Sequence, residues 1–318
     1  MTAIDALRRA VEGGGGERVL TLDAAFGGLP DTAHGGSVLA VFDAVAARTG
    51  PRELAGHYLK RVPPATPLRL RVEPATDACR LELFDDRTIL VSGSVHGPHS
   101  ERAATSPAPP AATPPAEDAM ALPISAGCFA CGVDNPMGLA VRLRADATAV
   151  GGTWMPRPGF RQVDGTLSPV ALTTMLDEAA FWLGALATGE SGMTTELRVT
   201  LHAPVTADGP ITVAGPRSTV HARANDPRYW DTTVAAHDAA GRLVASASIT
   251  FVAVRGAARR LVTGMLAVNA PELLRRVFPT YIRERTTPGS GRCQRVSNWH
   301  HLGHDRAHLG HDRVRSAR

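Results

Sequence analysis

Aromatic residues make up only 5% of the 318-residue chain, which also contains just four cysteines and a single lysine, Lys60. Four scattered cysteines do not form the dense framework of a disulfide-stapled fold. No apolar run reaches the ~18–20 residues that a membrane span requires, and the first residues lack the basic-then-apolar layout of a signal peptide. We therefore expect a soluble, cytoplasmic protein without a membrane partner.

Positive charge is concentrated at the C-terminal end of the chain. Residues 257–318 contain twelve Arg and four acidic residues, a net charge of +8, so the remaining residues carry −4 of the total charge of +4. Nucleic-acid binding, if argued from charge, would rest on this segment alone. We expect no nucleic-acid partner.

Changes in composition divide the chain into four parts. The run SPAPPAATPP, residues 106–115, holds too much proline for a packed element and is typical of an extended linker. Beyond residue 286 the sequence is of low complexity and repeats LGHDR twice. We expect an N-terminal domain over 1–100, a Pro/Ala-rich linker over 101–122, a C-terminal domain over 123–256, and a basic, largely disordered tail over 257–318 with a short helix near 270–285.

The two domains share one order of elements. In each, an almost wholly apolar helical stretch, residues 36–47 or 169–187, precedes about four strand-like segments joined by turn sequences. A helix that is apolar nearly all round must be covered on most sides, and a curved sheet can cover it. Both helices hold an acid near the middle, Asp43 and Asp177. We interpret this order as an internal duplication and predict an α+β fold.

The sharpest functional pattern is His34-Gly35-Gly36, directly before the first helix. Glycine lets a ligand approach the backbone closely, and free N–H groups at a helix start can receive a developing oxyanion. Asp43 is the only polar side chain between residues 38 and 47, where an unpaired carboxylate is costly. These groups suit acyl transfer to water. A glycine-rich helix entry, with Asp43 bound to a backbone partner, explains the pattern equally well.

Both domains resemble hotdog-fold acyl-CoA thioesterases of the PaaI-like kind. In the first domain, HGGSVLAVFDAVA is similar to the HGG turn and central helix of that family. In the second, GCFACGVDNPMGLAVRL, LDEAAFW, TELRVTLHAP and RYWDTTVAAHDAAGRLVASASITFVAV resemble its opening segment, helix acid region and long strands. The likeness spans roughly 18–98 and 125–254. It implies two hotdog domains, each an antiparallel sheet wrapped around a central helix, that pair as a pseudo-dimer.

The resemblance implies roles for the first turn and helix. Asp43 matches the family acid that activates water or attacks the thioester, and Gly35 matches the glycine whose N–H polarises the thioester carbonyl. His34 matches the histidine that shapes the site, and Gly36 completes the motif. Gly28 stands where family members often carry Asn or Gln, a departure that favours a protein that binds but does not react.

The second domain departs further from the family pattern. Ser168 and Pro169 occupy the first two HGG positions, and Pro169 has no N–H to donate. The second domain therefore keeps two acids, Asp177 and Glu178, but lacks the oxyanion hole expected at the HGG turn of the first domain. We therefore expect one competent site per chain, built from Asp43 and the HGG turn, with a wall from the second domain. The alternative is a separately arranged site in which Asp177 acts.

Other polar residues have simpler explanations beside the functional ones. Cys128 and Cys131 form a C-x-x-C, but no second pair of ligands follows at the spacing of a zinc finger, so we expect a structural turn and no metal. Lys60 and Arg61 are candidates for contact with CoA phosphates, although a solvated face is the ordinary alternative. We expect no cofactor. Histidines of the tail could bind a metal adventitiously.

Three functions remain open at this point. Hydrolysis of an acyl-CoA or acyl-carrier thioester is the function that the resemblance implies, with Asp43 as the base or nucleophile. A non-catalytic protein that binds the same ligands is the first alternative. A double-hotdog dehydratase or hydratase is the second, although the segments typical of those enzymes are incomplete here. A homodimer of tandem chains is one assembly that the sequence allows.

Overall fold

Two buried helices lie at the centre of the fold in a computed structural model, which describes residues 1–97 and 112–282. Helix α2 spans Gly35–Ala46 and helix α4 spans Pro169–Thr188, close to the helices predicted from the sequence. Helix α4 is long and apolar enough for a membrane span, yet 83% of its most apolar window is buried within the protein. Its apolar character is therefore explained by its place in the core.

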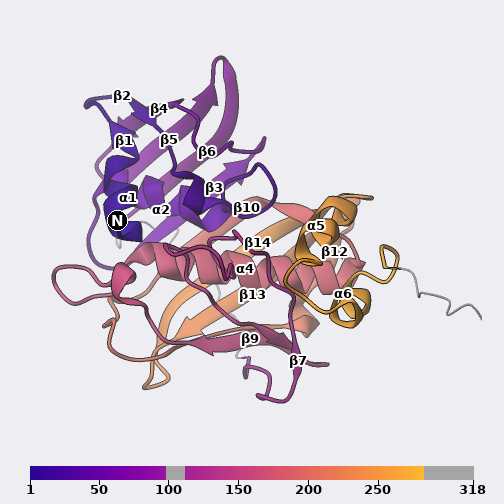
Figure 1. The fold of residues 1–318 in the computed structure, drawn as a ribbon. Helices are drawn as coiled ribbons and strands as arrows, with labels where there is room; N and C mark the ends of the chain where they lie inside the picture. Colours follow the sequence, from indigo (N-terminus) through magenta and orange to yellow (C-terminus); the bar gives the residue numbers. More distant parts are fainter. Residues whose placement is uncertain (98–111, 283–318) are drawn as a thin grey trace, which may run out of the picture. The chain divides into compact units, whose positions relative to one another are not determined.

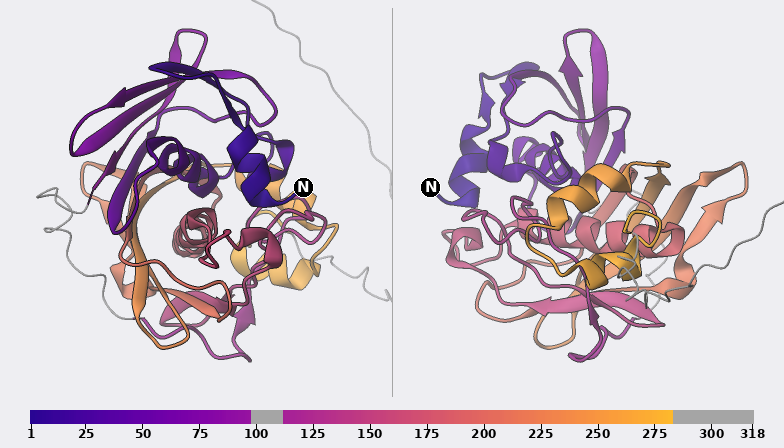
Figure 2. Two further views of the ribbon diagram at one scale, coloured as in Figure 1. Left: turned by 90° about the vertical axis from the view of Figure 1, so that its left-hand side faces the viewer. Right: turned by 45° about the vertical axis from the view of Figure 1, so that its right-hand side comes forward.

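One antiparallel sheet wraps around both helices (Figures 1 and 2). In the first half the strand order is β1-β2-β4-β5-β6-β3, and in the second half it is β10-β14-β13-β11-β9-β8-β7. The strands of the first half are β1 (Val11–Glu12), β2 (Glu17–Leu20), β3 (Arg52–Tyr58), β4 (Leu68–Pro74), β5 (Ala78–Asp85) and β6 (Thr88–His96). Those that follow are β7 (Met120–Ala121), β8 (Arg144–Ala145), β9 (Ala149–Trp154), β10 (Gly192–Leu201), β11 (Ile211–Pro216), β12 (His221–Arg223), β13 (Asp226–His237) and β14 (Leu243–Ala253).

The two halves are joined edge to edge by the strands that follow the two helices. Strand β3 pairs antiparallel with β10, in a register that places Leu54 opposite Val199. Because these are equivalent strands of the two halves, the pairing relates the halves as two subunits of a symmetric dimer would be related. The predicted α+β fold, with a sheet around a central helix in each half and the halves paired, is confirmed.

The helices α2 and α4 approach each other closely at the start of α2. A Cβ atom on Gly36 would lie 2.4 Å from the carbonyl oxygen of Thr173, so only glycine fits there without a shift of backbone. The Thr173 hydroxyl in turn donates to the carbonyl oxygen of Gly36 at 2.8 Å. Gly36 is thus required by the packing of the two halves, a reason that the sequence did not reveal.

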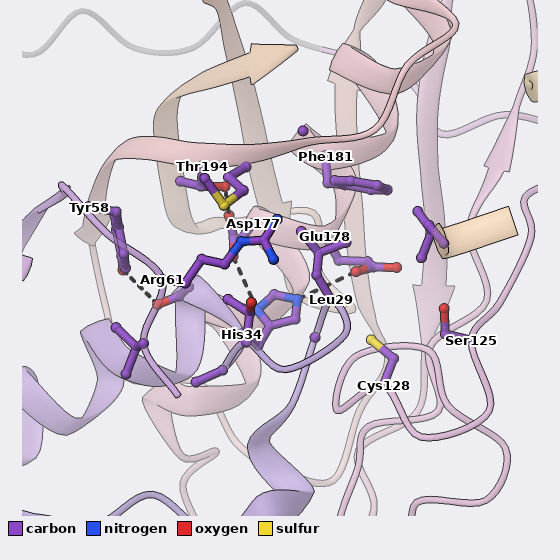
Figure 3. Close-up of a pocket in the computed structure, with 18 of the residues that line it drawn as sticks. Leu29, His34, Tyr58, Arg61, Ser125, Cys128, Asp177, Glu178, Phe181 and Thr194 are labelled. Carbon is purple, nitrogen blue, oxygen red and sulfur yellow. Dashed lines mark hydrogen bonds and ion pairs between the residues drawn. The ribbon is translucent and has the colours of Figure 1, made fainter. Parts of the chain in front are cut away.

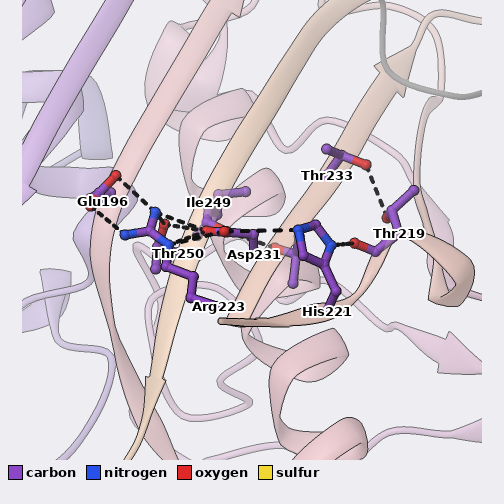
Figure 4. A network of polar contacts seen from close by, with 9 residues as sticks. Glu196, Thr219, His221, Arg223, Asp231, Thr233, Ile249 and Thr250 are labelled. Carbon is purple, nitrogen blue, oxygen red and sulfur yellow. Dashed lines mark hydrogen bonds and ion pairs between the residues drawn. The ribbon is translucent and has the colours of Figure 1, made fainter. Parts of the chain in front are cut away.

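A polar network on the strands of the second half ties four of them together (Figure 4). The guanidinium of Arg223, on β12, donates to Glu196 on β10 at 3.0 Å, to Asp231 on β13 at 3.0 Å and to Thr250 on β14 at 2.6 Å. Hydrogen bonds to these carboxylates raise the pKa of Arg223 above its ordinary value. The network contributes to the register of these strands.

The described part of the expected tail, residues 257–282, contains two helices, and the second lies in the stretch where the sequence predicts a short helix. Helix α5 spans Ala258–Met265 and helix α6 spans Pro271–Val277. Both helices bury apolar side chains, such as Leu261 and Leu274, in the core that the two halves share. Helix α6 begins at Pro271, and the side chain of Asn269 just before it binds the backbone of Ile124. Residues 283–318 lie outside the described residues.

The remaining short elements lie at the N-terminus and in the loops. Helix α1 spans Ala3–Arg9 and begins with a capping box between Thr2 and Asp5. Single 3₁₀ turns cover Ala24–Phe26, Pro158–Phe160 and Arg217–Thr219. Of the expected linker over 101–122, the structure describes residues 112–122, which include β7; residues 98–111 lie outside the described part.

Candidate functional site

The chain enters helix α2 through a turn that holds His34 inside the protein. His34 is the N-cap residue of the helix and only 6% of its surface is exposed. Its backbone N–H donates to Phe26 at 2.8 Å, and the N–H of Ala33 donates to Val62 at 2.8 Å. These bonds anchor the turn on both sides, so the imidazole points into the interface between the halves.

Two carboxylates from helix α4 face the two ring nitrogens of His34. Nδ1 lies 3.1 Å from Oδ2 of Asp177, and Nε2 lies 3.4 Å from Oε2 of Glu178 (Figure 3). Burial alone would lower the pKa of His34, but the contacts with Asp177 and Glu178 outweigh it and raise this pKa well above its ordinary value. The two carboxylates thus stabilise the protonated form of the imidazole.

The carboxylate of Asp177 is held by donors from both halves. Its Oδ2 accepts the backbone N–H of Gly36 at 2.9 Å, and its Oδ1 accepts the Thr194 hydroxyl at 2.6 Å. Burial raises the pKa of Asp177, but the contacts with His34, Thr194 and Gly36 reverse the shift and lower it below the ordinary value. Asp177 is therefore an ionised carboxylate in a buried, preorganised position.

Glu178 is oriented by its neighbour one turn further along helix α4. The indole N–H of Trp182 donates to Oε1 of Glu178 at 3.0 Å, which leaves Oε2 facing His34. The two adjacent acids of the sequence thus have different partners. Asp177 binds the start of α2, and Glu178 faces the far side of the imidazole.

The two glycines after His34 differ in what they can offer a ligand. The N–H of Gly36 is already occupied by Asp177, whereas the N–H of Gly35, at the first helical position, has no intrahelical acceptor. A Cβ atom on Gly35 would lie 2.8 Å from Oδ2 of Asp177. The Tyr58 hydroxyl holds the peptide from the other side by donating to the Gly35 carbonyl at 2.6 Å. One backbone donor therefore remains beside the carboxylate.

These groups line one pocket that both halves and helix α5 build. His34, Gly35 and Tyr58 come from the first half, and Asp177 and Thr194 come from the second. Apolar side chains complete the wall, among them Leu29, Phe181, Trp182, Met193, Leu261 and Met265. The site is thus incomplete in either half alone, and the acids in it come from the second half, whereas the sequence analysis expected Asp43 there with only a wall from the second domain.

Lys60 and Arg61 lie on the wall of this pocket and are exposed to solvent. Among the described residues, neither side chain has an acidic partner. Figure 3 places Arg61 on the side of His34 that is opposite Cys128. Both cations are therefore available to bind an anionic ligand where the pocket opens to solvent.

Asp43 does not share the pocket with His34. Its carboxylate forms a two-point ion pair with Arg52, with Nε–Oδ1 and NH2–Oδ2 distances of 2.5 and 2.7 Å. It lines a different cavity, next to Ser168 and Pro169 at the start of α4. The structure thus brings the HGG turn together with Asp177, and it brings Asp43 together with the turn that lacks the HGG motif.

The C-x-x-C of the second half lies against the same pocket. Cys128 and Cys131 are both buried thiols, 6% and 4% exposed. A hydrogen bond from Cys131 lowers the pKa of Cys128 and correspondingly raises that of Cys131. One ligand atom each from His34, Cys128 and Glu178 lies within 4.8 Å of the other two. These three residues are therefore the group that could hold a metal ion.

Sequence reasoning missed Thr194 and the role of Tyr58 because each acts through a contact with another element of its own half, Thr194 with Asp177 and Tyr58 with Gly35. Thr194 lies near the start of β10, the strand after helix α4. Its position near the start of this long strand is the one feature of the sequence that could have pointed to it. Tyr58 lies at the end of β3, and its hydroxyl binds the carbonyl of Gly35 at the start of α2. Neither contact has a local sequence pattern.

No protein-family model and no curated protein sequence matches the chain. Solved structures do match. A candidate thioesterase II from Thermobifida fusca superposes with a TM-score of 0.55 at 18% identity, over 80% of this chain and 100% of that one. A hot dog fold protein of unknown function from Alicyclobacillus acidocaldarius gives 0.54 at 14% identity, over 80% and 98% of the two chains. An acyl-CoA thioesterase II from Mycobacterium marinum gives 0.50 at 15%, over 80% and 99%.

Identities this low show the fold alone. The chain is thus a double-hotdog protein, with two hotdog domains in one polypeptide. Two of these three neighbours carry thioesterase names, and this bears on the proposal that follows.

Proposed function

We propose that the chain hydrolyses an acyl-CoA or acyl-carrier thioester, with Asp177 as the general base. The observation that carries this proposal is the buried carboxylate of Asp177 in the pocket wall, directly beside Gly35 at the first helical position of α2. A base and an oxyanion donor on the two sides of one pocket are what attack of water on a thioester carbonyl requires. The thioesterase names of the structural neighbours support the same reaction.

The proposed reaction proceeds through a tetrahedral intermediate. Asp177 takes a proton from water as the water oxygen attacks the thioester carbonyl, and the N–H of Gly35 stabilises the developing oxyanion. The carbon–sulfur bond then breaks, and the proton on Asp177 passes to the departing sulfur. The products are a free acid and a thiol. His34 and Thr194 act as positioning residues, since each contacts the Asp177 carboxylate.

Lys60 and Arg61 are proposed to contact the phosphates of CoA. Both are exposed on the pocket wall and lack acidic partners among the described residues. Phosphate contacts of this kind position a substrate, so they affect KM more than kcat. We also propose a cytoplasmic location, which the buried thiols of Cys79, Cys128 and Cys131 support.

One observation favours non-catalytic binding of the same ligands as a second candidate. Both oxygens of Asp177 already accept hydrogen bonds, and the N–H of Gly36 is occupied by one of them. A site with all these groups engaged could hold a thioester without reacting. Measured acyl-CoA binding without turnover would support this alternative.

The test is a panel of acyl-CoA substrates of increasing chain length, assayed with the wild-type chain and with Asp177→Asn. The variant keeps the shape of the side chain but loses its basicity, so kcat should fall by about 10²–10⁴-fold. Ser168→Ala is the matched control, because Ser168 is the N-cap of α4 where His34 is the N-cap of α2. It should hydrolyse the panel at the wild-type rate.

Acyl-pantetheine substrates, which lack the CoA nucleotide, test whether Lys60 and Arg61 contact the CoA phosphates. The double variant Lys60→Ala/Arg61→Ala should raise KM for acyl-CoA and leave KM for acyl-pantetheine unchanged. Full activity of Asp177→Asn across the panel would refute the assignment of the base. Equal effects on the two substrate classes would refute the assignment of the phosphate contacts.

A further inference from the structure

Three good metal ligands from distant parts of the sequence meet at one wall of the pocket. They are the imidazole of His34, the thiol of Cys128 and the carboxylate of Glu178, and one ligand atom of each lies within 4.8 Å of the other two. All three residues are buried, at 6% exposure each. Surface acids often gather without holding a metal, but a buried cluster of nitrogen, sulfur and oxygen ligands must satisfy three polar groups at once.

We propose that His34, Cys128 and Glu178 bind one Zn²⁺ ion. Zinc accepts nitrogen, thiolate and carboxylate ligands in one tetrahedral site, whereas magnesium and calcium prefer oxygen alone. The inference does not rest on the proposed hydrolysis, because Asp177, Thr194 and Gly35 are not among the ligands.

The distances agree with a tetrahedral ion. Two atoms that each lie about 2.0–2.2 Å from zinc at the tetrahedral angle are about 3.3–3.5 Å apart. The Nε2 of His34 and Oε2 of Glu178 are 3.4 Å apart. This separation is long for a charge-assisted hydrogen bond. The sulfur of Cys128 needs a separation of about 3.6 Å from each of them, and it lies within 4.8 Å of both.

Each ligand is held in the orientation that coordination needs. The Nδ1 of His34 lies 3.1 Å from Asp177, which leaves Nε2 for the ion. The Trp182 indole binds Oε1 of Glu178 at 3.0 Å, which leaves Oε2. Metal-binding histidines and carboxylates usually have such outer partners, which fix the ring and the tautomer. The two free ligand atoms therefore face each other across the place where the ion would lie.

The loop that carries Cys128 is fixed against the first half of the molecule. The N–H of Phe129 donates to Gly27 at 2.7 Å, and the side-chain amide of Asn135 donates to Ala25 at 2.7 Å. The carbonyl of Cys128 itself accepts the N–H of Gly132 at 2.9 Å. These bonds place the sulfur beside the turn of His34, so the segment that the sequence suggested as a simple structural turn also delivers a thiol.

Three protein ligands leave a fourth position for zinc. Cys128, His34 and Glu178 all line the pocket, so that position faces the space where a substrate or water would be. Zinc sites with three protein ligands and an open position are the kind found in zinc enzymes, whereas structural sites are closed by four. The ion could thus bind a water or a thiol that enters the pocket.

The decisive experiment titrates the metal-free full chain with Co²⁺ and follows the thiolate-to-cobalt charge-transfer band in the near ultraviolet. Cys293 and the histidines of residues 300–311 could bind cobalt on their own. All proteins in the experiment therefore carry Cys293→Ser. The charge-transfer band of the chain that keeps Cys128 is compared with the band of the chain that also carries Cys128→Ser. Cys79→Ser is the matched control, because Cys79 is equally buried but lies on β5, outside the metal-ligand group.

We expect one equivalent of Co²⁺ with a charge-transfer band that Cys128→Ser abolishes and Cys79→Ser preserves, and displacement of the cobalt by one equivalent of Zn²⁺. Trp182→Phe removes the indole N–H that binds Glu178 and part of a buried ring, and should weaken zinc binding by about 10–100-fold. Glu178→Gln provides a second test if Cys128→Ser fails to fold, and it should weaken zinc binding further. A band that persists in Cys128→Ser, or no thiolate band in any variant, would overturn the proposal.

Discussion

Replacing Asp43 by Asn separates a structural role of this acid from a catalytic one. The Asp43 carboxylate is 5% exposed and makes two short bonds to the Arg52 guanidinium, which is itself largely buried. The substitution keeps the size of the side chain and removes its charge. Arg52 then keeps its bond to the carbonyl of Gly50 at 2.7 Å and can donate to the neutral amide oxygen of Asn, but its buried charge has lost the opposite charge.

The expected cost follows from this burial. Removing one partner of a buried ion pair costs about 3–5 kcal/mol, because the other charge is left uncompensated. For a domain of this size each kcal/mol shifts the melting temperature by about 2–4 °C, so the melting temperature of Asp43→Asn should fall by roughly 6–20 °C. The double variant Asp43→Leu/Arg52→Met removes both charges and should recover most of the loss.

The assay combines thermal unfolding with acyl-CoA hydrolysis well below the melting temperature of the variant. Asp31→Asn is the control for loss of an acid, because Asp31 pairs with Arg260 on the surface and should change stability by less than about 1 kcal/mol. Asp43→Asn should unfold early yet hydrolyse substrate at the wild-type rate. A variant with a wild-type melting temperature and no turnover would show that Asp43 carries the chemistry and that Asp177 does not.

Two further predictions concern the packing of the halves and a surface turn. Gly36→Ala should lower the unfolding free energy by about 1–3 kcal/mol in urea, because its Cβ would meet Thr173, while Gly14→Ala, with open space around it, should have little effect. Hydrogen bonds from Arg242 lower the pKa of Asp238. The contribution of the Asp238 carboxylate to stability is therefore complete above the ordinary Asp pKa, and it is lost as the pH falls through the lowered pKa of the folded protein. The difference in unfolding free energy between the wild-type chain and Asp238→Asn should therefore shrink as the pH is lowered from 7 to 3. A difference that stays constant over this range would contradict this account.

Much of the fold could be predicted from the sequence because the signals are local. The apolar helices at 36–47 and 169–187 and the alternating strands each depend on neighbouring residues. Helix α6 lies in the stretch where a short helix was predicted, whereas α5 was missed because it is short, contains Arg259 and Arg260 and lies close to a low-complexity segment. They form because their apolar side chains reach a core built by distant parts of the chain.

The candidate site could be predicted only in part, because its two sides lie 141 positions apart, at Gly36 and Asp177. The offset of nine residues between His34 and Asp43 favoured a site built on one helix, with both residues acting on the same substrate. Nine residues rise about 13 Å along an α-helix, which is too far for both ends to act on one carbonyl. The acid of each helix instead lies near the start of the other helix, and this geometry appears only once the halves are paired.

The continuous sheet across β3 and β10 has a consequence for how this protein can change. In a dimer of identical hotdog subunits, any substitution alters both sites at once. Here the halves are covalently fused but differ in sequence, so each site can vary alone. One helix start carries His34 and faces Asp177, while the other carries Ser168 and Pro169 near Asp43, which is neutralised by Arg52. Fusion thus allows the two equivalent acids to have different partners, an imidazole for Asp177 and a guanidinium for Asp43.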